Sequence, residues 1–573
     1  MPVVAGDVDG QHFDVVVVGS GFGGSVSAYR LAEGGRSVCV LERGKAYAPH
    51  SFPRSPAGLA DNLWDPSKGL HGMFDVWSFK GIDALVSSGL GGGSLIYANV
   101  LIRKDESWFV QDHPYRPGVT EAWAVQYRDL ESHYDRVERF LDVQVLPDEV
   151  ASDLKKTQAM KHAAATMAGE VTWSLAPLGV RFRGPGGEGL LGGALADGAY
   201  PSLHGPTGRR TCRLCGECDI GCNDGAKSTL DHTYLSAASK HGAVLSTRSE
   251  VRALRRTPAG FEVDFVVHEA ATAGSPTDTA LLPVCTVHAV EVVLAAGTLG
   301  STYLALRSRR TLGLDSPALG TRFCGNGDLL GFILNADRQL EGSRGPVITS
   351  YIRSPDAVDT GDPGDRGSYL EDAGYPAFLE WLAEASQVRG VAARAARFAW
   401  DRLRERVSGR RSSNLSGALH EVLGKNRLTT HSVPLLGMGR DVPDGLLYLP
   451  GGSSGSGPGA PPPLLDSTWS TATSEAHFAR LEGRMEQVAK AVGGRYVRNP
   501  LGMLRRVITV HPLGGLPMAC SPNDGVVDGL GRVYGVPGLY VADGSVMPGP
   551  VGPNPSLTIA AFADRMCDAM LGT

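Results

Sequence analysis

The stretch that decides the fold is FDVVVVGSGFGGSVSAYRLAE, residues 13–33. Its opening residues, FDVVVV, are rich in β-branched side chains, which predicts a parallel strand buried on both faces. The glycines Gly19, Gly21 and Gly24 follow at once as G-x-G-x-x-G, and residues 25–33 then predict a helix. Strand, glycine turn and helix in this order are typical of a unit that binds a dinucleotide.

Each glycine of this turn has a physical purpose. Gly19 allows the tight turn, Gly21 lets the backbone approach a pyrophosphate, and Gly24 lets the helix pack on the strand with its positive end toward the phosphates. The next predicted strand, SVCVLERG at residues 37–44, carries Glu42, 23 residues after Gly19. An acid near this spacing accepts hydrogen bonds from the adenosine ribose. The unit fits NAD and FAD equally well.

Length and composition exclude several classes of protein. A chain of 573 residues exceeds the size of one hydrophobic core, so two or more domains, or one large domain with insertions, are expected. The net charge of −5 gives no basic footprint for phosphates, which excludes a nucleic-acid partner. The sequence shows no apolar run that could span a bilayer, and its first residues, MPVVAGDVDGQHFD, lack a secretion signal. We therefore expect the protein in the cytoplasm.

Five further motifs extend the first unit along the chain. They are GLGGGS at 89–94, VVLAAGT at 292–298, HPLGG at 511–515, GLYVADG at 538–544 and GPNPSLT at 552–558. On these motifs and their order, the chain resembles the glucose-methanol-choline (GMC) oxidoreductases. Within that family it is most similar to the cholesterol oxidases that hold FAD without a covalent link.

The resemblance implies an α/β fold, with a Rossmann-like FAD-binding domain of GMC type and an inserted α+β substrate-binding domain. It places the discontinuous FAD-binding domain in residues 10–115, 212–325 and 500–573. The substrate-binding or cap domain then takes residues 116–211 and 326–499. The implied activity is oxidation of an alcohol CH–OH group to a carbonyl by hydride transfer to flavin N5.

Three catalytic side chains follow from the resemblance. His511 and Asn554 match the pair that holds the alcohol oxygen on the substrate side of the flavin, where they orient the alcohol and handle its proton. Glu380, followed by Trp381, is similar to the glutamate that accepts a proton in cholesterol oxidases. A solvated glutamate on an amphipathic helix fits the same two residues.

The closing motif also predicts part of the cofactor site. Residues 555–570 predict a helix with Pro555 at its first position and Asn554 as its cap. In the resembling family the flavin ring lies at the positive end of this helix, which would stabilise negative charge on the reduced ring. Asp543 is similar to a residue that contacts the phosphate or ribityl part, although a buried structural role also fits. The predicted cofactor contacts are Gly19, Gly21, Phe22, Gly23, Gly24, Glu42, Gly92, Gly93, Ser94, Asn99, Val251, Ala296, Gly297, Asp543, Gly544, Asn554 and Pro555.

Four of the nine cysteines crowd into one short segment. Their spacing, C-x2-C-x2-C-x3-C, is that of loops that hold iron–sulfur clusters. Against a cluster, the fourth cysteine of such a run in ferredoxins serves a different cluster, and Asn223 stands where a proline usually follows. Cys285 or Cys324 would then have to complete the site, while a zinc site, a local disulfide and packed thiols stay open. The run consists of Cys212, Cys215, Cys218 and Cys222.

The leading hypothesis is oxidation of a 3β-hydroxysteroid or another bulky apolar alcohol, with oxygen or another carrier reoxidising FAD. One alternative is an FAD alcohol dehydrogenase that passes electrons to a redox partner through the cysteine run. Another is a flavin redox sensor without turnover, against which His511 and Asn554 argue. Residues 391–411 predict a basic helix with an apolar stripe, either a solvated face or a lid that contacts a membrane surface.

Overall fold

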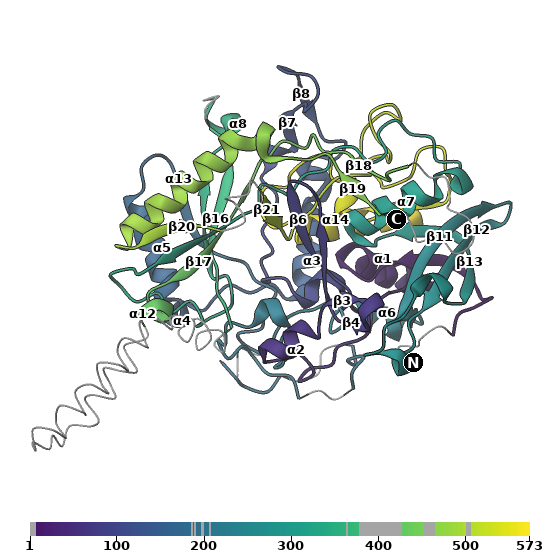
Figure 1. Cartoon of the computed structure of the whole chain (residues 1–573), viewed down its shortest axis with the longest axis horizontal. Coiled ribbons are helices and arrows are strands. Elements are labelled where there is room, and N and C mark those ends of the chain that lie inside the picture. The colour runs from purple at the N-terminus through teal and green to yellow at the C-terminus, as the bar shows by residue number, and fades with distance from the viewer. Residues whose placement is uncertain are drawn as a thin grey trace, which may run out of the picture.

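A computed structural model describes residues 7–184, 187, 191–195, 200–205, 208–361, 365–376, 427–451, 464–499 and 506–572. The predicted catalytic Glu380 and the predicted helix at 391–411 lie outside the described residues. Figure 1 shows two bodies of secondary structure, with α1 and the strands β11 to β13 on the right and β16 and β17 with α5 and α13 on the left. Each body is built on one sheet.

The first sheet has seven strands, in the order β10-β2-β1-β13-β12-β11, with β22 paired to β13. Strands β10, β2, β1, β13 and β22 run parallel to one another, whereas β12 is antiparallel to both β13 and β11. The buried run predicted at 13–18 is the central strand β1. The bounds are β1 His12–Val18, β2 Val38–Leu41, β10 Val244–Ser246, β11 Ser249–Thr257, β12 Gly260–Val267, β13 Val284–Leu294 and β22 Leu539–Val541.

Helices cover this sheet. The first helix, α1, packs against α6 and α14, α14 packs in turn against α3, and α7 packs against β11. Helix α1 begins at Phe22, earlier than the predicted start at residue 25, because Gly23 and Gly24 continue the helix directly out of the turn. The bounds are α1 Phe22–Glu33, α3 Tyr127–Leu141, α6 Tyr234–Lys240, α7 Gly297–Leu312 and α14 Ser556–Leu571.

The second sheet has six antiparallel strands in the order β20-β14-β17-β16-β15-β9. Helices α5 (Lys155–Thr166) and α13 (Glu475–Ala491) pack on it. All six strands fall inside the ranges predicted for the cap domain, whereas α3, from the same ranges, packs with the first sheet. The bounds are β9 Thr172–Leu175, β14 Leu329–Leu334, β15 Ser350–Ser354, β16 Ser368–Asp372, β17 Val433–Gly439 and β20 Arg495–Arg498. The predicted domain boundaries themselves stay a prediction.

A small third sheet joins β5 (Phe74–Ser78), β6 (Ile82–Ser87) and β21 (Val507–Thr509), and it leads the chain into residue 511. Among the described residues, no helix combines the length and the apolar character needed to cross a membrane. The remaining short elements are α2 Pro56–Ala60, α4 Asp148–Asp153, α8 Ala357–Thr360, α12 Arg427–Thr430, β3 Trp64–Asp65, β4 Leu70–His71, β7 Val110–Asp112, β8 Thr120–Ala122, β18 Leu447–Tyr448 and β19 Asp466–Ser467.

Candidate functional site

A cavity of about 840 Å³ is lined by residues from both large sheets. Segments far apart in the sequence form one side of it: residues 18–23, 295–300, 543–544 and 554–556. Strands β14 and β17 of the second sheet contribute to the other side. The cavity therefore needs the beginning, the middle and the end of the described chain.

The glycine turn fits a dinucleotide. Gly19 has a φ of +97°, and a Cβ there would lie 2.3 Å from the Ala295 carbonyl oxygen, so a side chain is excluded by the protein itself. A Cβ on Gly24 would lie 2.1 Å from the Gly19 oxygen, in agreement with its predicted packing function. A Cβ on Gly21, by contrast, would meet no protein atom within 4 Å and would point into free space beside a residue that lines the cavity. That space suits a pyrophosphate at the start of α1, where no side chain caps the helix.

Glu42 lies at the end of β2 and lines the cavity. Its Oε2 accepts hydrogen bonds from the Ser20 backbone N–H and hydroxyl, at 3.2 and 2.7 Å, and its Oε1 accepts one from the Gly44 N–H at 2.8 Å. Burial raises the pKa of this carboxyl group, and the three hydrogen bonds oppose that rise. The carboxyl is thus held in a fixed position on the cavity wall, and its contact with a ribose stays a prediction.

Asp543 holds two elements of the cavity wall together. Its Oδ2 accepts a hydrogen bond from the Ser301 hydroxyl of α7 at 2.5 Å, and its Oδ1 accepts from the Ser545 N–H and hydroxyl at 2.9 and 2.5 Å. The structural role weighed from the sequence is therefore present. Asp543 also lines the cavity with Gly544, and Ala296 and Gly297 line it at the start of α7. A contact between Asp543 and the cofactor stays a prediction.

The remaining predicted cofactor contacts divide into two groups. Phe22, Gly23, Gly92, Gly93, Val251 and Pro555 line the cavity. Ser94 and Asn99 do not: the Ser94 hydroxyl donates to the Gly91 carbonyl at 2.7 Å, and the Asn99 side chain is fully buried behind the wall. Ser94 accordingly shapes the glycine-rich loop from within, while any direct contact of these two side chains with FAD stays a prediction.

His511 follows β21 and lines the cavity beside a buried carboxylate. Its Nδ1 lies 2.9 Å from Asp328 Oδ1, and the side chain of Asp328 is 1% exposed. Asp328 Oδ2 accepts from the Thr509 hydroxyl at 2.8 Å and from the Val510 N–H at 2.9 Å. Because an ionised carboxylate only accepts hydrogen bonds, Nδ1 carries the proton of a neutral His511 ring, and Nε2 keeps a lone pair.

Asn554 lines the same cavity but does not cap the closing helix, so that expectation is wrong. Helix α14 begins at Ser556 with Pro555 in the cap position, and no side chain caps it. The Asn554 Nδ2 instead donates to Glu371 Oε2 on β16, at 3.5 Å. The Asn554 Oδ1 and the Glu371 Oε1 are buried without a hydrogen-bond partner among the described residues. Burial raises the pKa of Glu371 well above its usual range.

Asp328 and Glu371 were missed by the sequence reasoning. Asp328 directly precedes β14, in GDLL at 327–330, and Glu371 is the fourth residue of β16, SYLED at 368–372, so both belong to segments with the pattern of ordinary strands. A weak signal exists in both: a carboxylate at a predicted strand end is unusual if that end is buried. Glu371 is the carboxylate that the structure places at Asn554, whereas the predicted Glu380 lies outside the described residues and stays a prediction.

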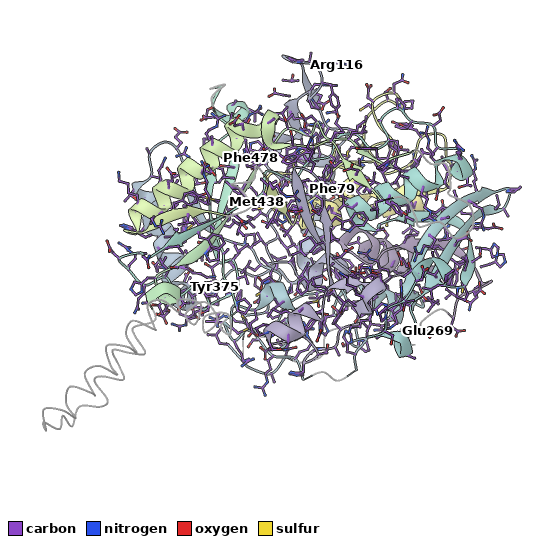
Figure 2. The ribbon with its side chains drawn as sticks, in the orientation of Figure 1. Phe79, Arg116, Glu269, Tyr375, Met438 and Phe478 are labelled. Atoms are coloured by element: carbon purple, nitrogen blue, oxygen red, sulfur yellow. The ribbon has the colours of Figure 1, made fainter. Side chains whose placement is uncertain are left out.

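The second sheet gives the cavity an apolar wall. Residues of β14 and β17 alternate, because successive side chains on a strand point to opposite faces. Leu329, Ile333, Val433 and Leu435 belong to the core with α5 and α13, whereas Leu330, Phe332, Pro434 and Leu436 line the cavity. Tyr375, labelled in Figure 2, follows β16 and also lines the cavity, with its hydroxyl donating to the Thr429 carbonyl at 2.6 Å.

The cysteine run forms a loop on the other side of the cavity wall. All nine cysteines of the chain are free, which removes the local disulfide as an explanation in this structure. Cys285 on β13 and Cys324 are not among the residues that surround the loop, so neither completes a site there. The four cysteines of the run line a second, small cavity together.

Comparison with known proteins gives one consistent family. Models of the GMC oxidoreductases match residues 13–324 and 478–563. A cholesterol oxidase of Mycobacterium tuberculosis (strain ATCC 25618 / H37Rv) is 31% identical over 568 residues, which cover 96% of this chain and 90% of that protein. A cholesterol oxidase of Acinetobacter baumannii is 27% identical over 572 residues, covering 97% and 94%. A pyridoxine 4-oxidase from Mesorbium loti shares the fold, with a TM-score of 0.56 at 16% identity over 98% of this chain and 99% of that one.

These matches agree with the geometry of the site. The family models include the glycine turn at one end and the HPLGG and GPNPSLT motifs at the other, which the fold brings to one cavity. The predicted fold class, a Rossmann-like α/β domain with an inserted substrate-binding part, is confirmed. The chain belongs to the GMC oxidoreductases, a family of FAD-binding enzymes that act on alcohols.

Proposed function

We propose that this chain binds FAD in the large cavity and oxidises the secondary hydroxyl group of a bulky apolar alcohol, such as a 3β-hydroxysteroid, to a ketone. The observation that carries the proposal is the position of the apolar wall. Leu330, Phe332 and Leu436 line the same cavity as His511 and Asn554. A large hydrocarbon body would bury its surface against this wall, at about 25 cal/mol per Å² of apolar area, while its hydroxyl group meets the two polar side chains.

The residues that would hold FAD come from three segments. The start of α1 would bind the pyrophosphate, Glu42 the ribose, and the start of α14 the flavin ring. FAD supplies the acceptor for the hydride. The N–H groups at the start of α14 have no side-chain cap, so the positive helix end would stabilise negative charge beside it.

His511 would act on the alcohol proton. Asp328 keeps the ring proton on Nδ1, which leaves the Nε2 lone pair to accept a proton from the hydroxyl group. Asn554 would hold the alcohol oxygen through its amide, and Glu371 fixes that amide from behind. Glu371 is fully buried and favours its neutral form, so it adds no negative charge where an alkoxide would develop.

Three observations support a sterol-like substrate. They are the apolar wall, the size of the cavity, and two relatives that are named cholesterol oxidases. Oxygen is the proposed acceptor that returns the flavin to its oxidised state. A second candidate function differs in this last step alone, as an alcohol dehydrogenase that passes electrons to a carrier. It is favoured by the four-cysteine loop beside the cavity wall.

The test follows the flavin colour. The purified protein with FAD is mixed under anaerobic conditions with cholesterol, a long-chain primary alcohol or glucose, and absorbance near ~450 nm is recorded. We expect rapid bleaching with the sterol, and slow or no bleaching with glucose. A His511→Asn variant should bleach about 100-fold more slowly or worse. Bleaching by none of the alcohols would overturn the proposal, and hydrogen peroxide formed in air separates the two acceptors.

A further inference from the structure

The loop of residues 212–222 is a cluster of reactive side chains that alcohol oxidation by FAD leaves unused. Its four thiols line one closed-in cavity of about 20 Å³. They are free of disulfides, and they come from consecutive turns of one short segment. Four thiols that share a cavity are the ligand set of a metal centre, so the question is which kind of centre the geometry suits.

The spacing of the thiols does not suit a single ion. Around zinc, bound at about 2.3 Å by each sulfur, neighbouring thiolates stand only about 3.8 Å apart. In the part of the chain that the structure describes, three ligand atoms within 4.8 Å of one another occur at His133, Asp564 and Asp568, and no group of cysteines meets this limit. In an iron–sulfur cluster each cysteine binds a different iron, so the sulfurs stand further apart around a common centre.

The backbone of the loop turns its polar groups toward the sulfurs. The Leu214 N–H donates to the Cys212 Sγ at 3.3 Å. Leu214 and Gly216 have φ values of +59° and +68°, and a left-handed conformation is unusual for leucine, so tertiary contacts must hold it there. Hydrogen bonds to cluster sulfurs are one of the ways in which proteins tune iron–sulfur centres.

Two fully buried polar side chains, Lys227 and Asn99, border the loop. Lys227 is 1% exposed, lines the thiol cavity, and donates only to the carbonyl oxygens of Leu95, Tyr97 and Cys218, at 3.2, 2.9 and 2.7 Å. Within the described ranges it forms no salt bridge with a carboxylate. The groups that favour the charged form of Lys227 are the Cys218 and Cys222 thiols of the loop, followed by Asp219 and Asp231. The Asn99 amide is 0% exposed and lies next to Cys218, with no other partner for its side chain among the described residues.

We propose that residues 212–222 bind an iron–sulfur cluster through Cys212, Cys215, Cys218 and Cys222, and that this cluster conducts electrons from the flavin site to an external one-electron carrier. A thiolate-ligated cluster would add negative charge beside Lys227, whose three hydrogen bonds all go to neutral carbonyl oxygens. The position is suitable, because Asp219 and Ile220, which follow Cys218 directly, line the large cavity. Lys227 ties the loop to the carbonyls that follow the glycine-rich segment at 89–94.

The electrons balance as follows. An alcohol that becomes a ketone loses two electrons and two protons. The flavin receives both electrons, the cluster passes them on singly, and two equivalents of a one-electron carrier are reduced, with the protons released to solvent. The carrier is a one-electron acceptor, for which ferricyanide substitutes in vitro. This transfer rests on the proposed function, whereas the binding of the cluster does not.

The experiment measures the iron and sulfide content of the protein and its spectra, independently of alcohol oxidation. The full-length protein is purified without oxygen, reconstituted with ferrous iron and sulfide, and desalted. We expect about four iron and about four sulfide per chain, a broad absorption beyond the flavin bands, and an electron paramagnetic resonance signal after reduction with dithionite. Cys218→Ser should lose most of the iron. Cys520→Ser, which replaces an exposed cysteine outside the loop, is the control and should keep all of it.

Several outcomes would overturn the proposal. These are a protein that stays free of iron after reconstitution, one zinc per chain with all four thiols protected, or a disulfide within the loop. If Cys218→Ser does not fold, the iron and sulfide content of the wild type decides alone. Bleaching of the wild-type flavin by alcohol is recorded on the same sample. A cluster without bleaching defeats the proposed function, and bleaching without a cluster defeats this inference.

Discussion

At the scale of single residues, the pair of His511 and Asp328 decides which ring nitrogen can take the alcohol proton. In Asp328→Asn, an amide group can donate to Nδ1, which moves the ring proton to Nε2 and removes the base. We expect kcat for alcohol oxidation to fall about 100-fold or more, with little change in KM. Steady-state kinetics measures both constants. Asp315→Asn, whose parent side chain is 98% exposed, should leave both unchanged.

Glu371 gives a second prediction, on stability. Its pKa is raised in the folded protein because the carboxyl group is buried, so its contribution to stability is complete below the ordinary value of 4.5 and is lost as pH rises through the raised pKa. Glu371→Gln cannot ionise. Between pH 4.5 and the raised pKa, the free energy of unfolding of the variant should therefore rise relative to the wild type by up to about 1.4 kcal/mol per pH unit. Urea unfolding at pH 5, 6 and 7 measures the difference; parallel curves for the two proteins would refute it.

Residue-level prediction from sequence succeeded where spacing carries the information. Gly19, Gly21 and Gly24 lie within one turn, and His511 and Asn554 lie in compact motifs. It failed for Asp328 and Glu371, because each lies 183 residues from the side chain it supports. Such a pairing depends on how the second sheet packs against the rest of the molecule, and the periodicity of hydrophobic residues within one segment carries no information about that packing.

At the scale of elements, helix α14 is fastened to its neighbours by a buried charge network. Asp564, with a side chain 1% exposed, pairs with Arg30 of α1 and with His133 and Arg136 of α3, the last two at 2.6 and 2.8 Å. Although burial acts in the opposite direction, the hydrogen bond from His133 and the charge of Arg30 lower the pKa of Asp564. These groups could also coordinate a metal, but the two arginines already neutralise the carboxylate.

Asp564→Asn should destabilise the protein by about 3 kcal/mol at pH 7, because it removes the buried carboxylate of the network and leaves Arg30, His133 and Arg136 to share Asp568. The lowered pKa means that the native contribution is present above the ordinary value of 3.8 and fades as pH falls below it. The gap between wild type and variant should then shrink in acid. Urea unfolding at pH 7 and pH 3.5 checks both points. Asp568→Asn, on the same helix but with a side chain 22% exposed, should lower the free energy of unfolding clearly less. Equal destabilisation by the two substitutions would contradict the prediction.

Elements were predicted well when their period was regular. The strand at β1 was found to within one residue from FDVVVV, and the closing helix α14 to within one residue from its apolar sequence. The cap role of Asn554 was wrong, because a distant strand, β16, supplies a partner for its side chain. Tertiary contacts override a local preference in this way when the competing group is buried.

At the scale of the whole molecule, the cavity joins segments from the start, the middle and the end of the described chain, so FAD should stabilise the entire fold. With FAD at about 100 times its Kd, the gain is about 2.7 kcal/mol, which thermal melting detects as a higher Tm. Gly21→Ala should leave the Tm without FAD unchanged, since the new Cβ meets no protein atom within 4 Å, but should abolish most of the rise. Gly483→Ala, at a half-buried position of α13 where no atom lies within 4 Å of the new Cβ, is the matched control and should keep the rise.

Because α14 and β22 stand so late in the sequence, α1 and β13 wait for their packing partners while the ribosome completes the polypeptide. The glycine turn is synthesised long before α14 and β22, and its surroundings are complete only when these two elements have packed. Incorporation of the flavin must accordingly follow translation rather than accompany it, and a nascent chain halted before residue 556 should be a substrate for chaperones and proteases rather than a partial holoenzyme.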